Sequence, residues 1–142
     1  MTVHLVKLCA GAQSIDDLSD RVGRIVAANR AAGRGNLHSH VTRMKPKRTS
    51  ELLDGGSLYW VIKGTIQARQ EIIAIEPRVD SDQIERVAIM LAPTIITTHA
   101  APRRAFQGWR YLEGDDAPAD LGNGQSAAPP ALHRELAELG LL

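Results

Sequence analysis

The sequence predicts an α+β fold, a small curved, mainly antiparallel β-sheet or barrel with two to three helices. Residues 37–44, 58–63 and 84–92 alternate between apolar and polar side chains, which is typical of strands that bury one face. Connections after residue 57 are mostly of hairpin length and contain no helical pattern, so a purely parallel sheet is not expected. With 142 residues, of which 44% are hydrophobic, the chain is long enough to bury one core without a metal or a disulfide.

The first elements are a strand, a helix and a second strand. Residues 3–8 form a short apolar run that predicts a strand. Ser14 can cap the following helix, because its hydroxyl accepts hydrogen bonds from backbone N–H groups of the first turn, and Gly33 ends that helix. The apolar stripe of the helix consists of Ile15, Leu18, Val22, Ile25 and Val26. The alternation over 37–44 predicts the second strand.

A short helix and five strands are expected after this point. In order, they are a helix ended by Gly55 and Gly56, a strand over 57–63, a hairpin of strands 66–76 and 84–92, and two short strands over 95–99 and 105–112. Trp60 lies between Leu58 and Ile62 on one strand face, so it is expected in the core.

The chain is expected to form one domain over residues 1–112. Residues 113–130 are rich in Gly, Asp, Ala, Pro and Ser, which predicts an acidic, extended linker. Residues 131–142 predict a C-terminal helix. Its narrow apolar stripe consists of Leu132, Leu136 and Leu139. Because so short a helix is marginal in water, we expect it to dock on its own domain or on a second copy of the chain, which would form a homodimer.

Charge is segregated along the chain, although the total is almost balanced. The protein has 17 Lys and Arg against 16 Asp and Glu, yet no acidic residue lies between Asp20 and Glu51. The basic residues of that interval are Arg21, Arg24, Arg30, Arg34, Arg43, Lys45, Lys47 and Arg48. A local cluster of positive charge attracts a polyanion more strongly than the net charge suggests. For the arginines of the first helix, a solvated helix face is the alternative interpretation.

Aromatic residues gather beside a second group of arginines. Of the two Trp, two Tyr and one Phe, three lie within 106–111, next to Arg103, Arg104 and Arg110. Cations that bind phosphates, together with flat rings that stack on bases, are typical of RNA sites, whereas packing in the core is the alternative role of the rings. The sequence therefore predicts a groove that binds RNA or another polyanion. Its residues are Arg43, Lys45, Lys47, Arg48, Arg103, Arg104, Trp109, Arg110 and Tyr111.

Two other function classes fit the same chain. A small metal-independent nuclease or other hydrolase would use His40 as base, with Tyr59 or Lys63 stabilising the phosphorane. Tyr59 and Lys63 are about 13 Å apart along a strand, so one substrate group touches both only if the chain bends at Gly64. A non-enzymatic protein-interaction or dimerisation module would instead use the C-terminal helix. Whether the protein is an enzyme is left open by the sequence.

Three histidines are considered as metal ligands. His38 and His40 share one face of the 37–44 strand, and His99 is a third candidate. A further ligand would be needed, and no Cys cluster or His-Glu motif supplies one, so neither a metal nor a cofactor is predicted. Histidines in such positions more often form structural hydrogen bonds or belong to an anion site.

The sequence predicts a soluble cytoplasmic protein that does not bind a membrane. Cys9 is the only cysteine and lies in an apolar run, which indicates a buried thiol in a reducing compartment. The N-terminal residues lack the long apolar stretch of a signal peptide. No stretch approaches the roughly 18 apolar residues that a membrane span needs.

Four segments carry resemblances to known families. They are HVTRMKPKRTSELLDGGSLYWVIKG at 40–64, ARQEI at 68–72, PRRAFQGWRYL at 102–112 and DAPADL at 116–121. These segments resemble an uncharacterised bacterial family, domain of unknown function family 1489, which implies no activity and no site residues. The basic strand, the helix ending in Gly-Gly and the later strands also resemble PUA-like barrels, including the ASCH and EVE groups, which implies recognition of RNA or modified bases. The Lys-x-x-Glu-x-Arg stretch of the ASCH group is absent, and residues 57–63 stand in its place.

Overall fold

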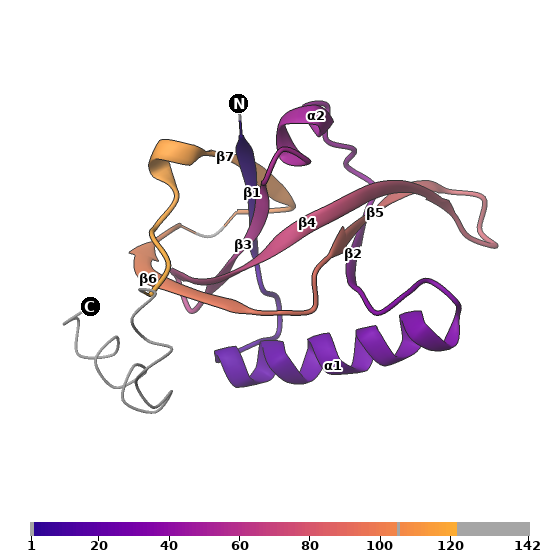
Figure 1. The fold of residues 1–142 in the computed structure, drawn as a ribbon, viewed down its shortest axis with the longest axis horizontal. Coiled ribbons are helices and arrows are strands. Elements are labelled where there is room, and N and C mark those ends of the chain that lie inside the picture. The colour runs from indigo at the N-terminus through magenta and orange to yellow at the C-terminus, as the bar shows by residue number, and fades with distance from the viewer. Residues whose placement is uncertain (1, 105, 122–142) are drawn as a thin grey trace.

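The computed structural model describes residues 2–104 and 106–121 (Figure 1). Its elements are β1 (Val3–Leu8), α1 (Ile15–Ala31), β2 (His38–Thr42), α2 (Thr49–Leu52), β3 (Ser57–Ile62), β4 (Thr65–Val79), β5 (Glu85–Leu91), β6 (Ile96–Pro102), β7 (Trp109–Glu113) and the 3₁₀ turn η1 (Gly114–Asp116). Within the described residues, seven strands and two α-helices confirm the α+β class, and each predicted strand has its counterpart.

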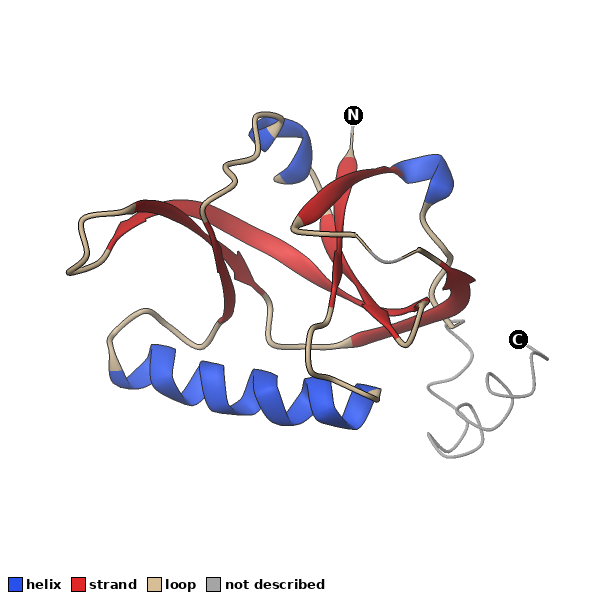
Figure 2. Cartoon of the chain, turned by 180° about the vertical axis from the view of Figure 1, so that it is seen from behind, coloured by secondary structure: helices blue, strands red, loops and turns tan. Residues whose placement is uncertain are grey.

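The strands form one mixed, mostly antiparallel sheet. Its order is β2-β5-β4-β3-β1-β7, and β6 also pairs with β4. The pair β1–β3 is parallel, and the other pairs are antiparallel. Over the described residues the end strands β2 and β7 do not pair with each other, so the sheet is curved but not closed. Figure 2 shows this curvature, with α1 lying along one side of the sheet. The predicted curved antiparallel sheet is confirmed, and the barrel alternative is not formed.

β4 connects the two parts of the sheet. Its first residues pair with β3 on one edge and with β6 on the other, and its last residues pair with β5. The hairpin of β4 and β5 extends beyond the rest of the sheet as an arm (Figure 1). The turn between β3 and β4 has two residues, Lys63 and Gly64, with φ of 52° and 76°. Both values suit a type I′ hairpin turn, so Gly64 lies in a tight turn rather than at a bend within a strand.

α1 begins and ends where the sequence indicates. The Ser14 hydroxyl accepts a hydrogen bond of 3.2 Å from the backbone N–H of Asp17, which satisfies one free donor of the first turn. Gly33, with φ of 75°, follows the end of the helix in the left-handed geometry that glycine adopts readily. Leu18 and Val22 are buried and turn one face of α1 toward the sheet. Among the described residues, no helix is long and apolar enough to cross a membrane.

The core lies on both faces of β1 and β3. The face toward α1 carries Val3, Leu5, Leu58, Trp60 and Ile62, and the opposite face carries Val6, Tyr59 and Val61. Trp60 is 3% exposed, which confirms its predicted place in the core. Burial on both faces explains why these two strands, the parallel pair, are almost continuously apolar.

The chain after β7 returns to the sheet. Asp120 forms an isolated bridge with Thr98 of β6, and the backbone N–H of Leu121 donates to the carbonyl of Thr97 at 3.0 Å. Leu121 is buried at 9% exposure. Residues 117–121 therefore contact β6, although their composition is that of a linker. Residues 122–130 of the predicted linker and the predicted helix over 131–142 lie outside the described residues.

Candidate anion-binding site

The segment after β2 is fastened to β7 by two aromatic side chains. The indole N–H of Trp109 donates to the carbonyl of Met44 at 2.7 Å. The hydroxyl oxygen of Tyr111 accepts from the backbone N–H groups of Lys47 at 2.8 Å and of Arg48 at 3.1 Å. Trp109 is only 6% exposed. Both side chains thus hold the backbone of this segment against β7.

The cations of this segment differ in their partners. Arg48 forms ion pairs with Glu51 at 2.6 Å and with Glu113 at 2.8 Å, and its guanidinium lies 5.2 Å from the centre of the Tyr111 ring. Its charge is therefore balanced within the protein. The exposed cations of the segment, called the basic loop below, are Arg43, Lys45 and Lys47. Within residues 2–104 and 106–121, they form no ion pair.

A cavity of about 180 Å³ lies between β1, α1 and β2. Its lining residues are Lys7, Leu8, Ala10, Arg21, Ile25, His38, Ser39, His40 and Trp60. Four of these side chains are basic, and among the described residues that line it none carries a carboxylate. The cavity with Lys7, Arg21, His38 and His40 is called the basic pocket below.

Strand pairing places Lys7 at the centre of this region. Lys7 on β1 is in register with Trp60 on β3 and with Trp109 on β7, so it lies between the two tryptophans. Because Trp109 binds the carbonyl of Met44, the basic pocket and the basic loop are adjacent. Burial lowers the pKa of the Lys7 ammonium, and repulsion from Arg21 adds to this effect.

Arg21 reaches the basic pocket from α1. Its guanidinium donates to the carbonyl of Ala10 and lies 3.6 Å from the sulfur of Cys9. Both partners are neutral groups of the turn that follows β1, and the buried Cys9 thiol has its pKa raised by burial. A guanidinium has five N–H donors, so donors remain for a ligand. Arg21 therefore closes the turn and forms no ion pair within the described residues.

A hydrogen-bond network fixes the tautomer of His38. The carbonyl oxygen of the Gln70 amide accepts from the indole N–H of Trp60 at 3.0 Å, and the amide nitrogen donates to Ala92 at 2.9 Å. The Gln70 oxygen also lies 2.9 Å from Nδ1 of His38, so Nδ1 must carry the proton there. Neutral His38 therefore has its lone pair on Nε2. Burial lowers the pKa of His38.

His40 lies on the same strand, and its ring meets Trp60 edge-on with centroids 6.4 Å apart. Burial lowers the pKa of His40 to about 4, and repulsion from Lys7, His38 and Arg21 adds to this effect. His40 is thus neutral near pH 7, chiefly because burial disfavours its charged form. A ligand that brings negative charge into the pocket opposes the repulsive part of this pKa shift.

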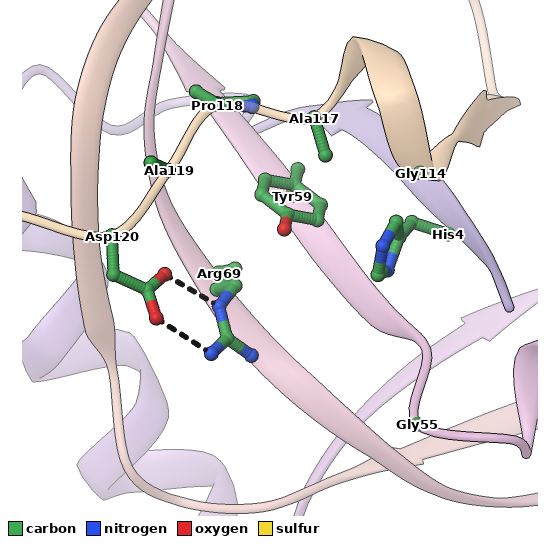
Figure 3. Close-up of a pocket in the computed structure, with 9 residues that line it drawn as sticks. All are labelled: His4, Gly55, Tyr59, Arg69, Gly114, Ala117, Pro118, Ala119 and Asp120. Atoms are coloured by element: carbon green, nitrogen blue, oxygen red, sulfur yellow. Dashed lines mark hydrogen bonds and ion pairs between the residues drawn. The ribbon is translucent and has the colours of Figure 1, made fainter.

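A second cleft, of about 270 Å³, lies on the other face of β3 (Figure 3). Arg69 forms two parallel hydrogen bonds to the Asp120 carboxylate, of 2.8 and 2.9 Å, and a third of 2.8 Å to the hydroxyl of Ser57. The nearby His4 accepts the backbone N–H of Ser57 on Nδ1, and its ring lies 5.1 Å from that of Tyr59. The guanidinium lowers the pKa of Asp120. The positive charge of this cleft is therefore balanced inside the protein.

A family model described as "Protein of unknown function (DUF1489)" matches residues 5–142 of the chain. The protein belongs to this family. The resemblance to family 1489 carried by the sequence segments is thereby confirmed. No curated protein and no solved structure matches the chain, and the likeness to PUA-like barrels gains no support.

The arginines of the second predicted cluster lie on another face of β7. Arg103 and Arg110 place their guanidinium groups 5.8 and 5.4 Å from the centre of the Phe106 ring. Successive residues of a strand point to opposite faces, so Arg110 points away from the face that carries Trp109 and Tyr111. Arg104, also predicted for the groove, is exposed in the loop after β6. Arg103 and Arg110 and the basic loop therefore lie on opposite faces of β7.

The predicted hydrolase residues do not converge. His40 lies beside Trp60, whereas Tyr59 is buried on the opposite face of β3, and Lys63 is exposed in the β3–β4 turn. His99 does not line the basic pocket. Among the described residues, no group of three or more His, Cys, Asp or Glu side chains is placed to hold a metal.

Sequence reasoning missed Lys7 and the ion pair of Arg69 with Asp120. Lys7 is one lysine in an apolar strand, and its importance comes only from the pairing of β1 with both neighbours. Arg69 and Asp120 lie 51 residues apart, in the segments ARQEI and DAPADL. No local signal in those segments indicates that the two side chains meet.

Proposed function

We propose that this protein binds RNA through a cationic surface that runs from the basic pocket to the basic loop. The observation that carries the proposal is the convergence of Lys7, Arg21, His38 and His40 from three elements without a carboxylate among the described residues that line the pocket. Positive charge that no internal group balances attracts an anionic partner. The adjacency of pocket and loop provides cations at several points along a polymer.

RNA is favoured over a small anion alone because the cations extend beyond the pocket. Arg43, Lys45 and Lys47 are exposed on a segment that Trp109 and Tyr111 hold rigidly against β7. Cations spaced along a backbone that is held in place suit successive phosphates of a nucleic-acid strand. In this proposal the two aromatic residues position the loop instead of stacking on bases, so binding depends mainly on the phosphate backbone.

The salt dependence of binding tests the proposal. Single-stranded and double-stranded RNA are titrated into the protein by fluorescence anisotropy at several salt concentrations, and the logarithm of the binding constant is plotted against the logarithm of salt. Arg43→Gln and Lys45→Gln are each expected to reduce the slope by about one, because each removes one phosphate contact. No binding of either RNA at low salt would overturn the proposal.

Arg30→Gln is the matched control. Arg30 and Arg21 are nine residues apart on α1, which at 100° per residue puts them on opposite sides of the helix. The control makes the same charge change outside the proposed surface, so its slope is expected to equal that of the wild type. Arg104→Gln and Arg110→Gln test whether the strand also reaches the other face of β7, where the predicted groove would need it. A slope that falls equally in Arg30→Gln and Arg43→Gln contradicts a localised surface.

A further inference from the structure

We infer that the basic pocket is a site for a terminal phosphate, the phosphomonoester at the 5′ or 3′ end of an RNA strand. The identity of the polymer rests on the proposed function above. The recognition of a phosphomonoester rests on the pocket itself, on its size, its charge and its hydrogen-bond donors. The basic loop would then bind internal phosphates, so the two parts of the surface would recognise different features of one ligand.

The size of the pocket suits a phosphate group. Its volume of about 180 Å³ lies below the roughly 300 Å³ at which sites for whole small molecules begin. The walls come from β1, α1 and β2, and Trp60, which is only 3% exposed, closes the inner side. An internal phosphodiester is linked to the RNA chain on both sides, so its site needs room for the chain to leave in two directions. A phosphomonoester is linked to the chain on one side only. A recessed cavity of this size therefore favours the end of a chain.

The charge of the pocket favours a dianion. Lys7 and Arg21 repel each other and both disfavour a positive charge on His40, and among the described residues none of the lining groups is acidic. A phosphomonoester carries about −1.5 to −2 charge at pH 7, and an internal phosphodiester carries a single negative charge. The more highly charged group offsets more of the repulsion. The titratable or charged groups that face His40 are Lys7 on β1, Arg21 on α1 and His38 on β2. A dianionic ligand would attract the positively charged form of each of them.

The basic pocket contains N–H donors that can bind phosphate oxygens. Arg21 uses two of its nitrogen atoms on Cys9 and Ala10 and keeps further N–H groups. His38 keeps its Nδ1–H bond to Gln70 whether the ring is neutral or cationic, because the Gln70 oxygen is an acceptor in both states. A proton on Nε2 therefore turns His38 into a second donor without any rearrangement. Lys7 adds an ammonium group at the centre of the region.

One RNA sequence with three kinds of end tests this inference. The oligonucleotide is prepared with a 5′-phosphate, with a 3′-phosphate, or with hydroxyls at both ends, and each affinity is measured by fluorescence anisotropy at one salt concentration. At least one phosphorylated form is expected to bind about tenfold more tightly than the hydroxyl form, since one charge-assisted hydrogen bond already accounts for about that factor. The preferred form shows which end enters the pocket.

Two lysine variants localise the effect. Lys7→Met is expected to abolish the preference for the phosphorylated end. Lys63→Met makes the same change in the exposed β3–β4 turn and is expected to retain the preference. Arg43→Gln should weaken all three forms equally, because it removes an internal phosphate contact. Circular dichroism melts establish that Lys7→Met is folded, and His40→Gln is the second variant if it is not. A preference that survives in both pocket variants overturns the inference.

Calorimetric titration with inorganic phosphate separates the inference from the proposed function. Phosphate binding that Lys7→Met abolishes, without RNA binding at low salt, supports the pocket and overturns RNA as the partner. If RNA binds equally well with and without a terminal phosphate, and inorganic phosphate does not bind, the inference is overturned and the proposed function is retained. Phosphate binding together with an end preference supports both, and the absence of all binding overturns both.

Discussion

The two faces of β3 carry two cationic clefts that differ in how their charge is balanced. Tyr59 borders one cleft and its neighbour Trp60 the other. On the Tyr59 side, Arg69 has the Asp120 carboxylate as a bidentate partner (Figure 3). On the Trp60 side, the guanidinium of Arg21 has only neutral partners within the described residues. Arg69 thus forms an ion pair that stabilises the fold on one face of β3. On the other face, Arg21 has no carboxylate partner within the described residues.

This difference in ion pairing gives the two arginines different roles. Arg69 stabilises the fold, whereas we propose that Arg21 binds a ligand. An arginine bound to a carboxylate by parallel hydrogen bonds contributes to stability, and here it holds the 117–121 segment on the sheet. A cluster of like charges destabilises the ligand-free protein and is retained where binding requires it. Changes in the two clefts should therefore affect stability in opposite directions.

The largest effect is expected from lowering the pH. His40 has a pKa of about 4 in the folded protein, whereas the value for an unfolded chain is 6.5. Above pH 6.5 the ring is neutral in both states. As the pH falls from 6.5 to 4, the unfolded chain binds a proton that the folded protein does not. Stability therefore falls over this window, by at most about 3 kcal/mol from His40.

Guanidinium unfolding curves at pH 7, 6, 5 and 4.5 measure this loss. His40→Gln is expected to flatten the curve of stability against pH, although the lowered pKa values of His38 and His4 leave part of the slope. Asp120 acts in a different window, because its lowered pKa stabilises the protein above pH 3.8 and this stability is lost only as the pH falls further. An unchanged slope in His40→Gln contradicts the lowered pKa of His40 in the folded protein.

A smaller loss is expected when the balanced cleft is broken. Asp120→Asn removes the carboxylate that faces Arg69, and the partly exposed pair limits the loss to about 1 kcal/mol at pH 7. Asp115→Asn is the control, because it makes the same change at an exposed position of η1. Chemical unfolding of both variants gives the difference. Equal stability of the two variants would show that Arg69 and Asp120 do not tie 117–121 to the sheet.

Most of the fold could be predicted from local patterns, because strands show an alternation of apolar and polar side chains in consecutive residues. The alternation around Trp60 identified β3 and the face that it buries. The parallel pairing of β1 with β3 could not be predicted, since it joins segments separated by α1, β2 and α2. The packing of 117–121 also escaped prediction. Composition reports the low apolar content of that segment but not its bonds to β6 or to Arg69.

The candidate site was predicted in part for the same reason. Alternation in β2 placed His38 and His40 on one face, and the run without acidic residues included Arg21. Lys7 escaped notice because only the tertiary pairing of β1 places it beside the two tryptophans. The sequence left base stacking and core packing open for Trp109, and it did not indicate that the indole N–H binds a backbone carbonyl of the adjacent segment. Such a contact depends on where two distant segments meet, which spacing does not encode.

The smallest expected effect has the opposite sign and concerns Lys7 in the basic pocket. Lys7→Met removes an ammonium whose pKa burial lowers, and it keeps an unbranched chain of similar length between Trp60 and Trp109. The ligand-free protein should gain about 0.5 kcal/mol, because repulsion with Arg21 disappears and no ion pair within the described residues is lost. Unfolding curves without and with inorganic phosphate measure the effect. Phosphate should stabilise the wild type more than Lys7→Met, so the order of the two proteins reverses at high phosphate. A loss of stability in the ligand-free variant would mean that Lys7 stabilises the fold as Arg69 does. The two clefts would then not differ in the way that their charges affect stability.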